Sequence, residues 1–307
     1  MSRLKTRFVV GSLLVALGGL SDARAQQAGL MPVPVFRDVQ VQSQTTFDAG
    51  TQLYTYSYTV TNPASNSGNL RSIHVDITRA ADSVQFSGQG LTVPVGPRSF
   101  SYDEFVSRFL APLNPPPMVA VGIQVPSGWT GGIGARGIAL FGALQVKNVL
   151  APGQKMSGLA LISPGLPTVR QMECIPHWVF VVEDHDKVTP EEEKRARAVE
   201  DSLNSKVATL GPSAIKTGSS AHWDQIRDDL NRAIQLKWIT DPALGIRLVN
   251  QLASARQAKD VSDSASTKAR LQLLMDSAAQ AAPGQIRQEA RDLILLNAQA
   301  LIAVPPN

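Results

Sequence analysis

The chain has 307 residues and a net charge of +4, and 43% of its residues are hydrophobic. Its length favours about two domains and is sufficient to bury ordinary hydrophobic cores without stabilising disulfides or metals. The single cysteine excludes an intrachain disulfide.

The first 25 residues have the pattern of a secretory signal peptide. Three basic residues precede an apolar run over 8–20, and Ala23-Arg24-Ala25 supplies the small-x-small site that a signal peptidase cleaves. The alternative is an uncleaved anchor helix, but the run is short for a membrane span. We expect a mature chain that begins near Gln26, is exported to a periplasm or beyond the cell, and keeps no transmembrane anchor.

Removal of this segment would also remove most of the net charge. Residues 1–25 hold four basic side chains and one acidic one, so the mature chain of 282 residues keeps 25 basic and 24 acidic side chains. A nearly neutral chain lacks the positive surplus that holds proteins on nucleic acid or anionic lipid. We therefore expect no nucleic-acid partner.

Residues 33–186 have the pattern of short strands separated by turns. Four apolar or aromatic residues alternate with polar ones over 54–61, and a second alternation covers 73–78, as expected for half-buried strands. One short helix is indicated over 102–110. Weaker strand patterns lie at 84–86, 118–125, 137–146, 156–162 and 178–182. Short strands punctuated by Gly and Pro favour an all-β sandwich.

The pattern changes to helical from Thr189. Thr189-Pro190-Glu191-Glu192 combines a Thr cap, Pro at the first helical position and Glu three residues after the cap. The helix that it opens, to about Asn204, is highly charged, and a loose linker with Gly211-Pro212 follows it. Residues 187–220 are therefore predicted as a charged connector helix and linker.

Residues 221–303 have the pattern of four amphipathic helices. Trp223, Ile226, Leu230 and Ala233 have helical spacing. Asp241-Pro242 caps the second helix, and Pro283 is predicted to open the fourth. Because each apolar stripe is too narrow to be buried alone, the helices should pack as a bundle. The predicted fold class is thus α+β by segregated domains: an N-terminal β-sandwich, a charged connector helix and a C-terminal four-helix bundle.

Two resemblances accompany these patterns. Trp238-Ile239-Thr240-Asp241-Pro242, Leu248-Val249-Asn250-Gln251-Leu252 and Asn297-Ala298-Gln299-Ala300-Leu301 resemble the FIMAH domain, a helical module of exported bacterial proteins, over about 225–302. That resemblance implies an accessory or adhesive role and brings no catalytic residues. Residues 150–158, followed by Ser163-Pro164-Gly165-Leu166-Pro167, are similar to the end of bacterial immunoglobulin-like sandwiches, which implies closure by the strand 178–182.

The stretch around the single cysteine is the first candidate for chemistry. Cys174 lies three residues before His177, with Pro176 between them. A thiolate nucleophile needs a base within hydrogen-bond reach, but residues three apart on a strand point to opposite faces and Pro176 disfavours a helix. We interpret Cys174 as a small buried hydrophobe and His177 as a polar loop residue.

Two further motifs match functional patterns only in part. Glu183-Asp184-His185-Asp186 contains metal-binding residue types, and His74 and Asp76 of an earlier strand are the residues that could join it, but zinc needs three or four converging ligands. We interpret the cluster as a solvated strand end. Residues 132–137 spell G-x-G-x-x-G without the strand, helix and acidic residue of a dinucleotide site, and we interpret them as a flexible loop.

The function expected from the sequence follows from these readings. No catalytic, cofactor-binding or metal-binding residue is assigned; Asp103-Glu104 resembles a helix start rather than a glycosidase pair. We expect an exported, non-catalytic interaction or surface-associated protein whose ligand is an unknown protein, glycan or cell-surface molecule. The alternative is an exported hydrolase whose site is assembled from separate strands.

Overall fold

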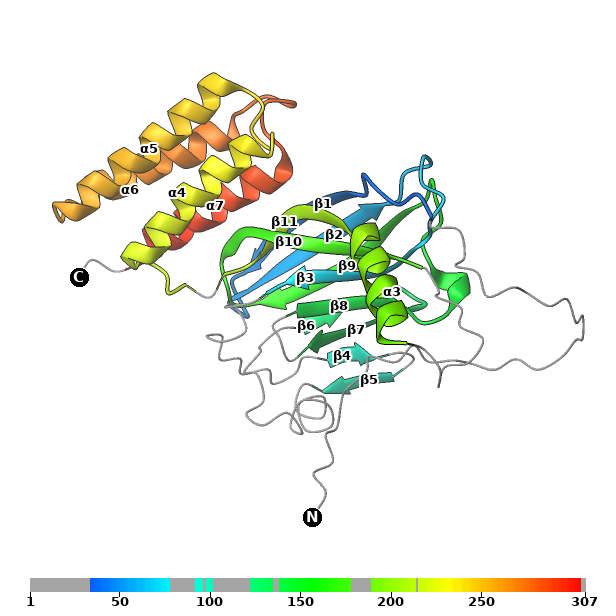
Figure 1. The fold of residues 1–307 in the computed structure, drawn as a ribbon. Coiled ribbons are helices and arrows are strands. Elements are labelled where there is room, and N and C mark those ends of the chain that lie inside the picture. The colour runs from blue at the N-terminus through cyan, green and yellow to red at the C-terminus, as the bar shows by residue number, and fades with distance from the viewer. Residues whose placement is uncertain are drawn as a thin grey trace, which may run out of the picture.

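A computed structural model describes residues 34–77, 92–95, 98–101, 122–134, 138–177, 189–213 and 215–304. Within them the fold is mixed α+β, with two antiparallel sheets built mostly from the N-terminal part and four helices from the C-terminal part (Figure 1). This agrees with the predicted separation of strands and helices along the chain. The predictions over 84–86, 102–110 and 178–182 lie outside the described residues.

The first sheet has four strands in the order β1-β2-β9-β6. They are β1 (Gln40–Asp48), β2 (Leu53–Thr61), β9 (Lys155–Ser163) and β6 (Gly122–Gln124). The alternation predicted for β2 is confirmed, since Tyr54, Tyr56, Tyr58 and Val60 are all buried while the residues between them are not. Strand β1 was not predicted, because polar side chains occupy most of its positions.

The second sheet has five strands in the order β11-β10-β3-β8-β7. They are β11 (Ser205–Pro212), β10 (Pro167–Pro176), β3 (Leu70–Asp76), β8 (Ile138–Ala143) and β7 (Trp129–Gly134). A separate hairpin pairs β4 (Thr92–Val95) with β5 (Arg98–Ser101), and a short 3-10 helix, η2 (Val146–Asn148), precedes β9.

The two sheets contact each other through tyrosines of β2. The Tyr58 ring lies 6.3 Å from the Phe141 ring of β8 in an edge-on arrangement, and its hydroxyl donates to the carbonyl of Leu210 in β11 at 2.9 Å. The Tyr56 hydroxyl donates to the Gly165 carbonyl at 2.6 Å. Both of these phenols therefore have an acceptor, and the Tyr58 bond links the first sheet to the second.

Helix α3 (Pro190–Leu203) begins at the predicted proline and ends one residue before the predicted end. The loose linker predicted after it is wrong for the following residues. Ser205 to Pro212 form β11, an edge strand that pairs antiparallel with β10 from Cys174 back to Pro167. The backbone groups of this segment that face β10 are thus used by the sheet, and the N–H of Leu210 on the other edge donates to the Ser43 hydroxyl at 3.2 Å.

The four remaining helices are α4 (Ser220–Gln235), α5 (Pro242–Asp260), α6 (Ser264–Ala279) and α7 (Gln288–Ala303). The cap at Asp241 is confirmed, since its carboxylate accepts from the N–H groups of Ala243 and Leu244. The predicted start of the fourth helix at Pro283 is wrong. Gly284 has a φ of +91° and Ile286 forms a bridge with Ile239, so the helix starts only at Gln288. None of the described helices is long and apolar enough to cross a membrane.

The helices form two layers relative to the sheets. α4 packs on β10, and α7 packs on β1, β10 and β11, whereas α5 and α6 pack on each other and on their neighbouring helices. The buried hydrophobic residues of sheets and bundle belong to one continuous cluster. The bundle therefore sits directly on the strands (Figure 1).

Candidate binding groove between helices α5 and α6

The structure places Cys174 in the interior rather than in a reactive site. It lies in β10 between Ile73 of β3 and Ser205 of β11, and none of its surface is exposed. Burial, together with the negative charge of the neighbouring Glu173, raises the pKa of the thiol to about 12. A nucleophilic cysteine needs the opposite shift. His177 lies beyond the strand end, and its N–H donates to the Asn69 carbonyl at 2.6 Å.

The residues considered for a metal site do not converge within the described structure. Glu183-Asp184-His185-Asp186 and Asp103-Glu104 lie outside the described residues. His74 has its Nδ1 atom 4.0 Å from a carboxylate oxygen of Glu173, and burial lowers the pKa of this histidine. Across the described ranges, no three His, Cys, Asp or Glu residues lie close enough together to hold a metal ion.

The G-x-G-x-x-G residues that are described belong to a strand. Gly132 and Gly134 lie in β7 and pair with Leu140 and Ile138 of β8, so the flexible loop expected there is wrong, and Gly137 lies outside the described residues. The adjacent Gly131 has a packing role, because a Cβ atom there would lie 2.3 Å from the Ile123 side chain. This glycine lets β7 approach β6 closely.

Three buried carboxylates join the bundle to the strands. Asp292 of α7 accepts from the N–H of Thr45 at 2.7 Å, and Glu289, one turn earlier, accepts from the N–H of Ser43 at 3.3 Å. Asp229 of α4 accepts from the Thr168 hydroxyl at 2.6 Å and from the N–H of Val169 at 3.3 Å. Burial raises the pKa of both aspartates to about 6.

A histidine and an asparagine complete this junction. Asn297 of α7 donates to the Pro167 carbonyl at 2.8 Å, and its side-chain oxygen lies 2.9 Å from Nε2 of His222 in α4. Burial lowers the pKa of His222. Each of these side chains is hydrogen-bonded to the backbone of a strand or to a side chain of another element. The junction is therefore a structural contact and not an open site.

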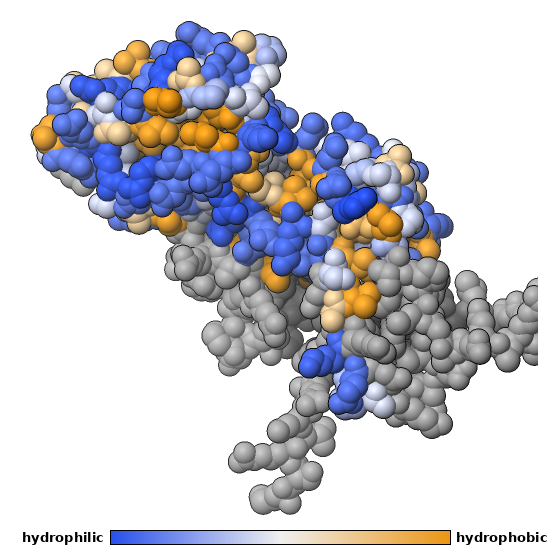
Figure 2. All heavy atoms as spheres, turned by 45° about the horizontal axis from the view of Figure 1, so that its top comes forward, coloured by the Kyte–Doolittle hydropathy of each residue, from blue (hydrophilic) through white to orange (hydrophobic). Residues whose placement is uncertain are grey.

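The open site lies on the outer layer of the bundle. A groove of about 420 Å³ runs between α5 and α6. Its lining consists of Ala243, Ile246, Arg247, Asn250, Gln251 and Ser254 of α5 with Arg270 and Leu273 of α6. Ile246 is 65% exposed and Leu273 56% exposed, and the space-filling view shows hydrophobic side chains gathered on the helical part between hydrophilic ones (Figure 2).

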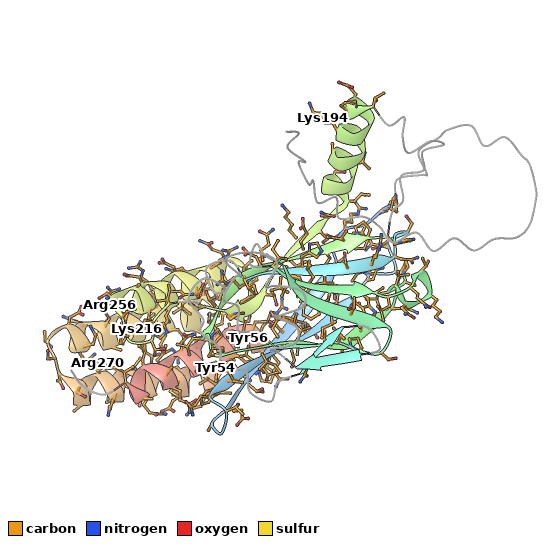
Figure 3. The ribbon with its side chains drawn as sticks, turned by 90° about the horizontal axis from the view of Figure 1, so that it is seen from below. Tyr54, Tyr56, Lys194, Lys216, Arg256 and Arg270 are labelled. Atoms are coloured by element: carbon orange, nitrogen blue, oxygen red, sulfur yellow. The ribbon has the colours of Figure 1, made fainter. Side chains whose placement is uncertain are left out.

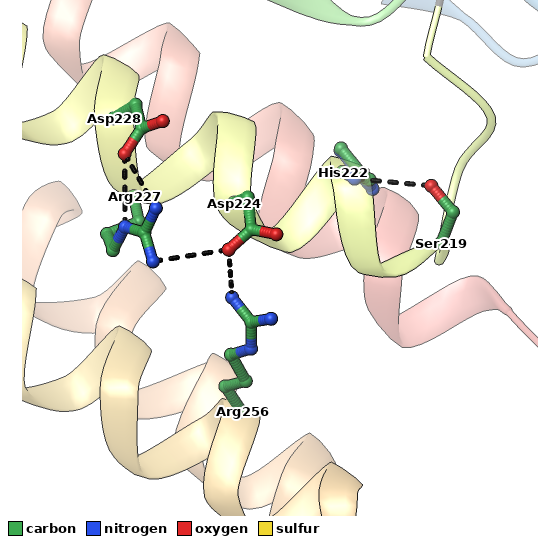
Figure 4. Close-up of polar contacts among 6 residues, drawn as sticks. All are labelled: Ser219, His222, Asp224, Arg227, Asp228 and Arg256. Carbon is green, nitrogen blue, oxygen red and sulfur yellow. Dashed lines mark hydrogen bonds and ion pairs between the residues drawn. The ribbon is translucent and has the colours of Figure 1, made fainter.

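The arginines of the groove differ from those on the neighbouring face of the bundle. Arg256 contacts Asp224 at 2.5 Å, and Arg227 contacts Asp224 and Asp228 at 3.2 and 3.0 Å (Figure 4). Arg247 and Arg270, by contrast, make no ion pair or side-chain hydrogen bond among the described residues. Figure 3 shows Arg270 on the helical part, away from Tyr54 and Tyr56 near the sheets.

Sequence reasoning did not find this groove. It assigned the Leu and Ala stripes of the helices to the core, which is right for Leu248, Leu252 and Leu274 and wrong for Ala269 and Leu273, both of which are exposed. The available signal on α5 was Ile246, an apolar residue that lies outside the predicted stripe of that helix. No model of a known protein family matches this chain, and no curated protein matches its sequence.

Proposed function

We propose that the protein is an exported, non-catalytic interaction protein that holds a segment of a partner protein in the groove between α5 and α6. The single observation that carries this proposal is the exposure of Ile246 and Leu273 beside two arginines without ion-pair partners. Large apolar side chains grouped on a surface and framed by polar ones are typical of protein–protein contact sites.

The rest of the molecule fits the role of a rigid support for this surface. We propose that its two sheets form an immunoglobulin-like sandwich and that α4 to α7 form a FIMAH-like bundle. The contacts between α7 and β1 would then fix the direction in which α5 and α6 face. The signal-peptide pattern of residues 1–25 supports an exported location for the interaction.

A photo-crosslinking experiment tests this function in the cells that make the protein. A photoreactive amino acid replaces Ala243, which lines the groove, or Lys268, which is exposed on α6 outside it. We expect the Ala243 position to give an adduct with one defined exported protein, identified by mass spectrometry, and the Lys268 position to give none. The adduct should disappear in the Ile246→Asp, Leu273→Asp double variant.

Two results of this experiment would contradict the proposal. Absence of any adduct at Ala243, or the same adducts at both positions and in the double variant, would show that the groove is not an interaction surface. Circular dichroism of the double variant serves as the folding control, since both substituted side chains are largely exposed.

A further inference from the structure

The charge of the groove indicates what kind of segment would bind there. Resting on the proposed function, we propose that the partner segment is an acidic amphipathic helix. Its apolar side chains would contact Ile246 and Leu273, and two carboxylates on separate turns would pair with Arg247 and Arg270. Binding of an amphipathic helix in an apolar groove is a recurrent mode of recognition.

The charged side chains that line the groove are of one sign only. Its two charged lining residues are both arginines, and its remaining polar residues are Asn250, Gln251 and Ser254. Residues 242–279 as a whole hold five basic and three acidic side chains. Arginine pairs with carboxylates through two parallel hydrogen bonds, so an acidic partner would satisfy both guanidinium groups.

The two arginines lie on opposite walls of the groove, Arg247 on α5 and Arg270 on α6. A three-residue turn over 261–263 joins the two helices, and Gln251 of α5 donates to the Ser277 hydroxyl of α6 at 2.9 Å, so the helices run antiparallel. A helix docked in the groove could therefore pair one carboxylate with each wall.

A two-fold symmetric pairing of two copies of the chain does not fit the charge of the groove. In a two-fold symmetric contact the same surface meets itself, and the arginines of one copy would then face those of the other without an acidic lining residue to compensate. Exposed Ile246 and Leu273 give the groove an apolar part, which favours an amphipathic helix over a purely anionic polymer.

A peptide-binding experiment with the purified full-length protein tests this proposal. The probe is a fluorescent helical peptide with a leucine stripe and two glutamates seven residues apart, and its matched control carries glutamine at both positions. By fluorescence anisotropy we expect the glutamate peptide to bind at least about tenfold more tightly than the control, since one close charge pair contributes on the order of 1.4 kcal/mol or more.

Matched protein variants assign the effect to the groove. Arg247→Glu and Arg270→Glu should each weaken the glutamate peptide about tenfold or more, whereas Lys268→Glu, the same charge change outside the groove, should alter binding less than about twofold. A peptide with lysine at both positions should bind the Arg247→Glu, Arg270→Glu double variant better than the unchanged protein.

The outcomes separate the two proposals. The two peptides could bind equally well, and this binding could be lost in the Ile246→Ser, Leu273→Ser double variant. That result would overturn the proposal of an acidic partner but would still support the groove as an interaction surface. Binding that no groove substitution alters would overturn both. Arginine-dependent binding of polygalacturonate or of phosphatidylglycerol vesicles, with no preference between the peptides, would replace the helix by an anionic polymer or membrane and also overturn the proposal.

Discussion

The carboxylate of Asp292 in helix α7 accepts a hydrogen bond from the backbone N–H of Thr45 in strand β1, across 247 positions of sequence. Strand β1 is the edge of its sheet, and edge strands have N–H groups that no neighbouring strand uses. Asp292 and Glu289 act as the missing acceptors, so the bundle covers an edge that would otherwise be available for pairing with another chain.

Two replacements of Asp292 should distinguish the contribution of its hydrogen bond to stability from the contribution of its charge. Asp292→Ala leaves the buried Thr45 N–H without an acceptor and should lower the free energy of unfolding by about 1–3 kcal/mol. Asp292→Asn keeps a side-chain oxygen at the same place and removes a buried charge, so it should cost less than about 1 kcal/mol. Urea denaturation followed by circular dichroism measures both, and equal stability of the two variants would contradict this role.

The two interface aspartates should make the protein more stable at mildly acidic pH. Burial raises the pKa of Asp229 and Asp292 from 3.8 to about 6. The folded state therefore binds their protons more tightly than the unfolded state, and stability falls as the pH rises from about 4 to about 6. Each group should contribute on the order of 1–2 kcal/mol to this change after allowance for solvent screening.

Neighbouring charges also shift the pKa values of these two aspartates. Arg170 and Arg232 lower the pKa of Asp229; near Asp292, Glu289 raises the pKa and Arg291 lowers it. His222 has a lowered pKa and so favours unfolding as the pH falls below its unfolded value. Comparison of the unchanged protein with the Asp229→Asn, Asp292→Asn double variant cancels the histidine contribution. If both proteins showed the same pH dependence, the aspartates would not be its source.

Cys174 should be unreactive in the folded protein. Its thiol is fully buried and its pKa is raised to about 12, so a disulfide reagent such as Ellman's reagent should release no thiolate product at about pH 8 in the native state. The same reagent should report one thiol per chain in concentrated guanidinium chloride. Rapid labelling of the native protein would show that the region around β10 opens or that the thiol is accessible.

Strand β11 should contribute to the stability of the strands even in a shortened chain without the bundle. A fragment that ends at residue 203 exposes the edge of β10 and removes Leu210, whose carbonyl accepts the buried Tyr58 hydroxyl. It should be less soluble and at least about 2 kcal/mol less stable than a fragment that ends at residue 213. Solubility and thermal unfolding of the two fragments compare them directly, and indistinguishable fragments would show that β11 is not part of the sheet's stability.

Local patterns were sufficient for the elements whose residues signal their own conformation. The Thr189-Pro190 start predicted α3, Asp241-Pro242 predicted the start of α5, and the alternation of Tyr54, Tyr56 and Tyr58 predicted β2. Each of these signals lies within a few residues, because capping groups and periodic burial act over one or two turns or one strand.

The tertiary structure alone decided the elements and contacts that depend on distant partners. Most positions of β1 hold polar residues, and β11 closely follows a helix. Both segments become strands because β2 and β10 supply hydrogen-bond partners. Asp292 has the sequence context of an ordinary surface acid on a helix, and only the packing of α7 on β1 buries it. The groove between α5 and α6 likewise exists because packing consumes one face of each helix and leaves Ile246 and Leu273 on another.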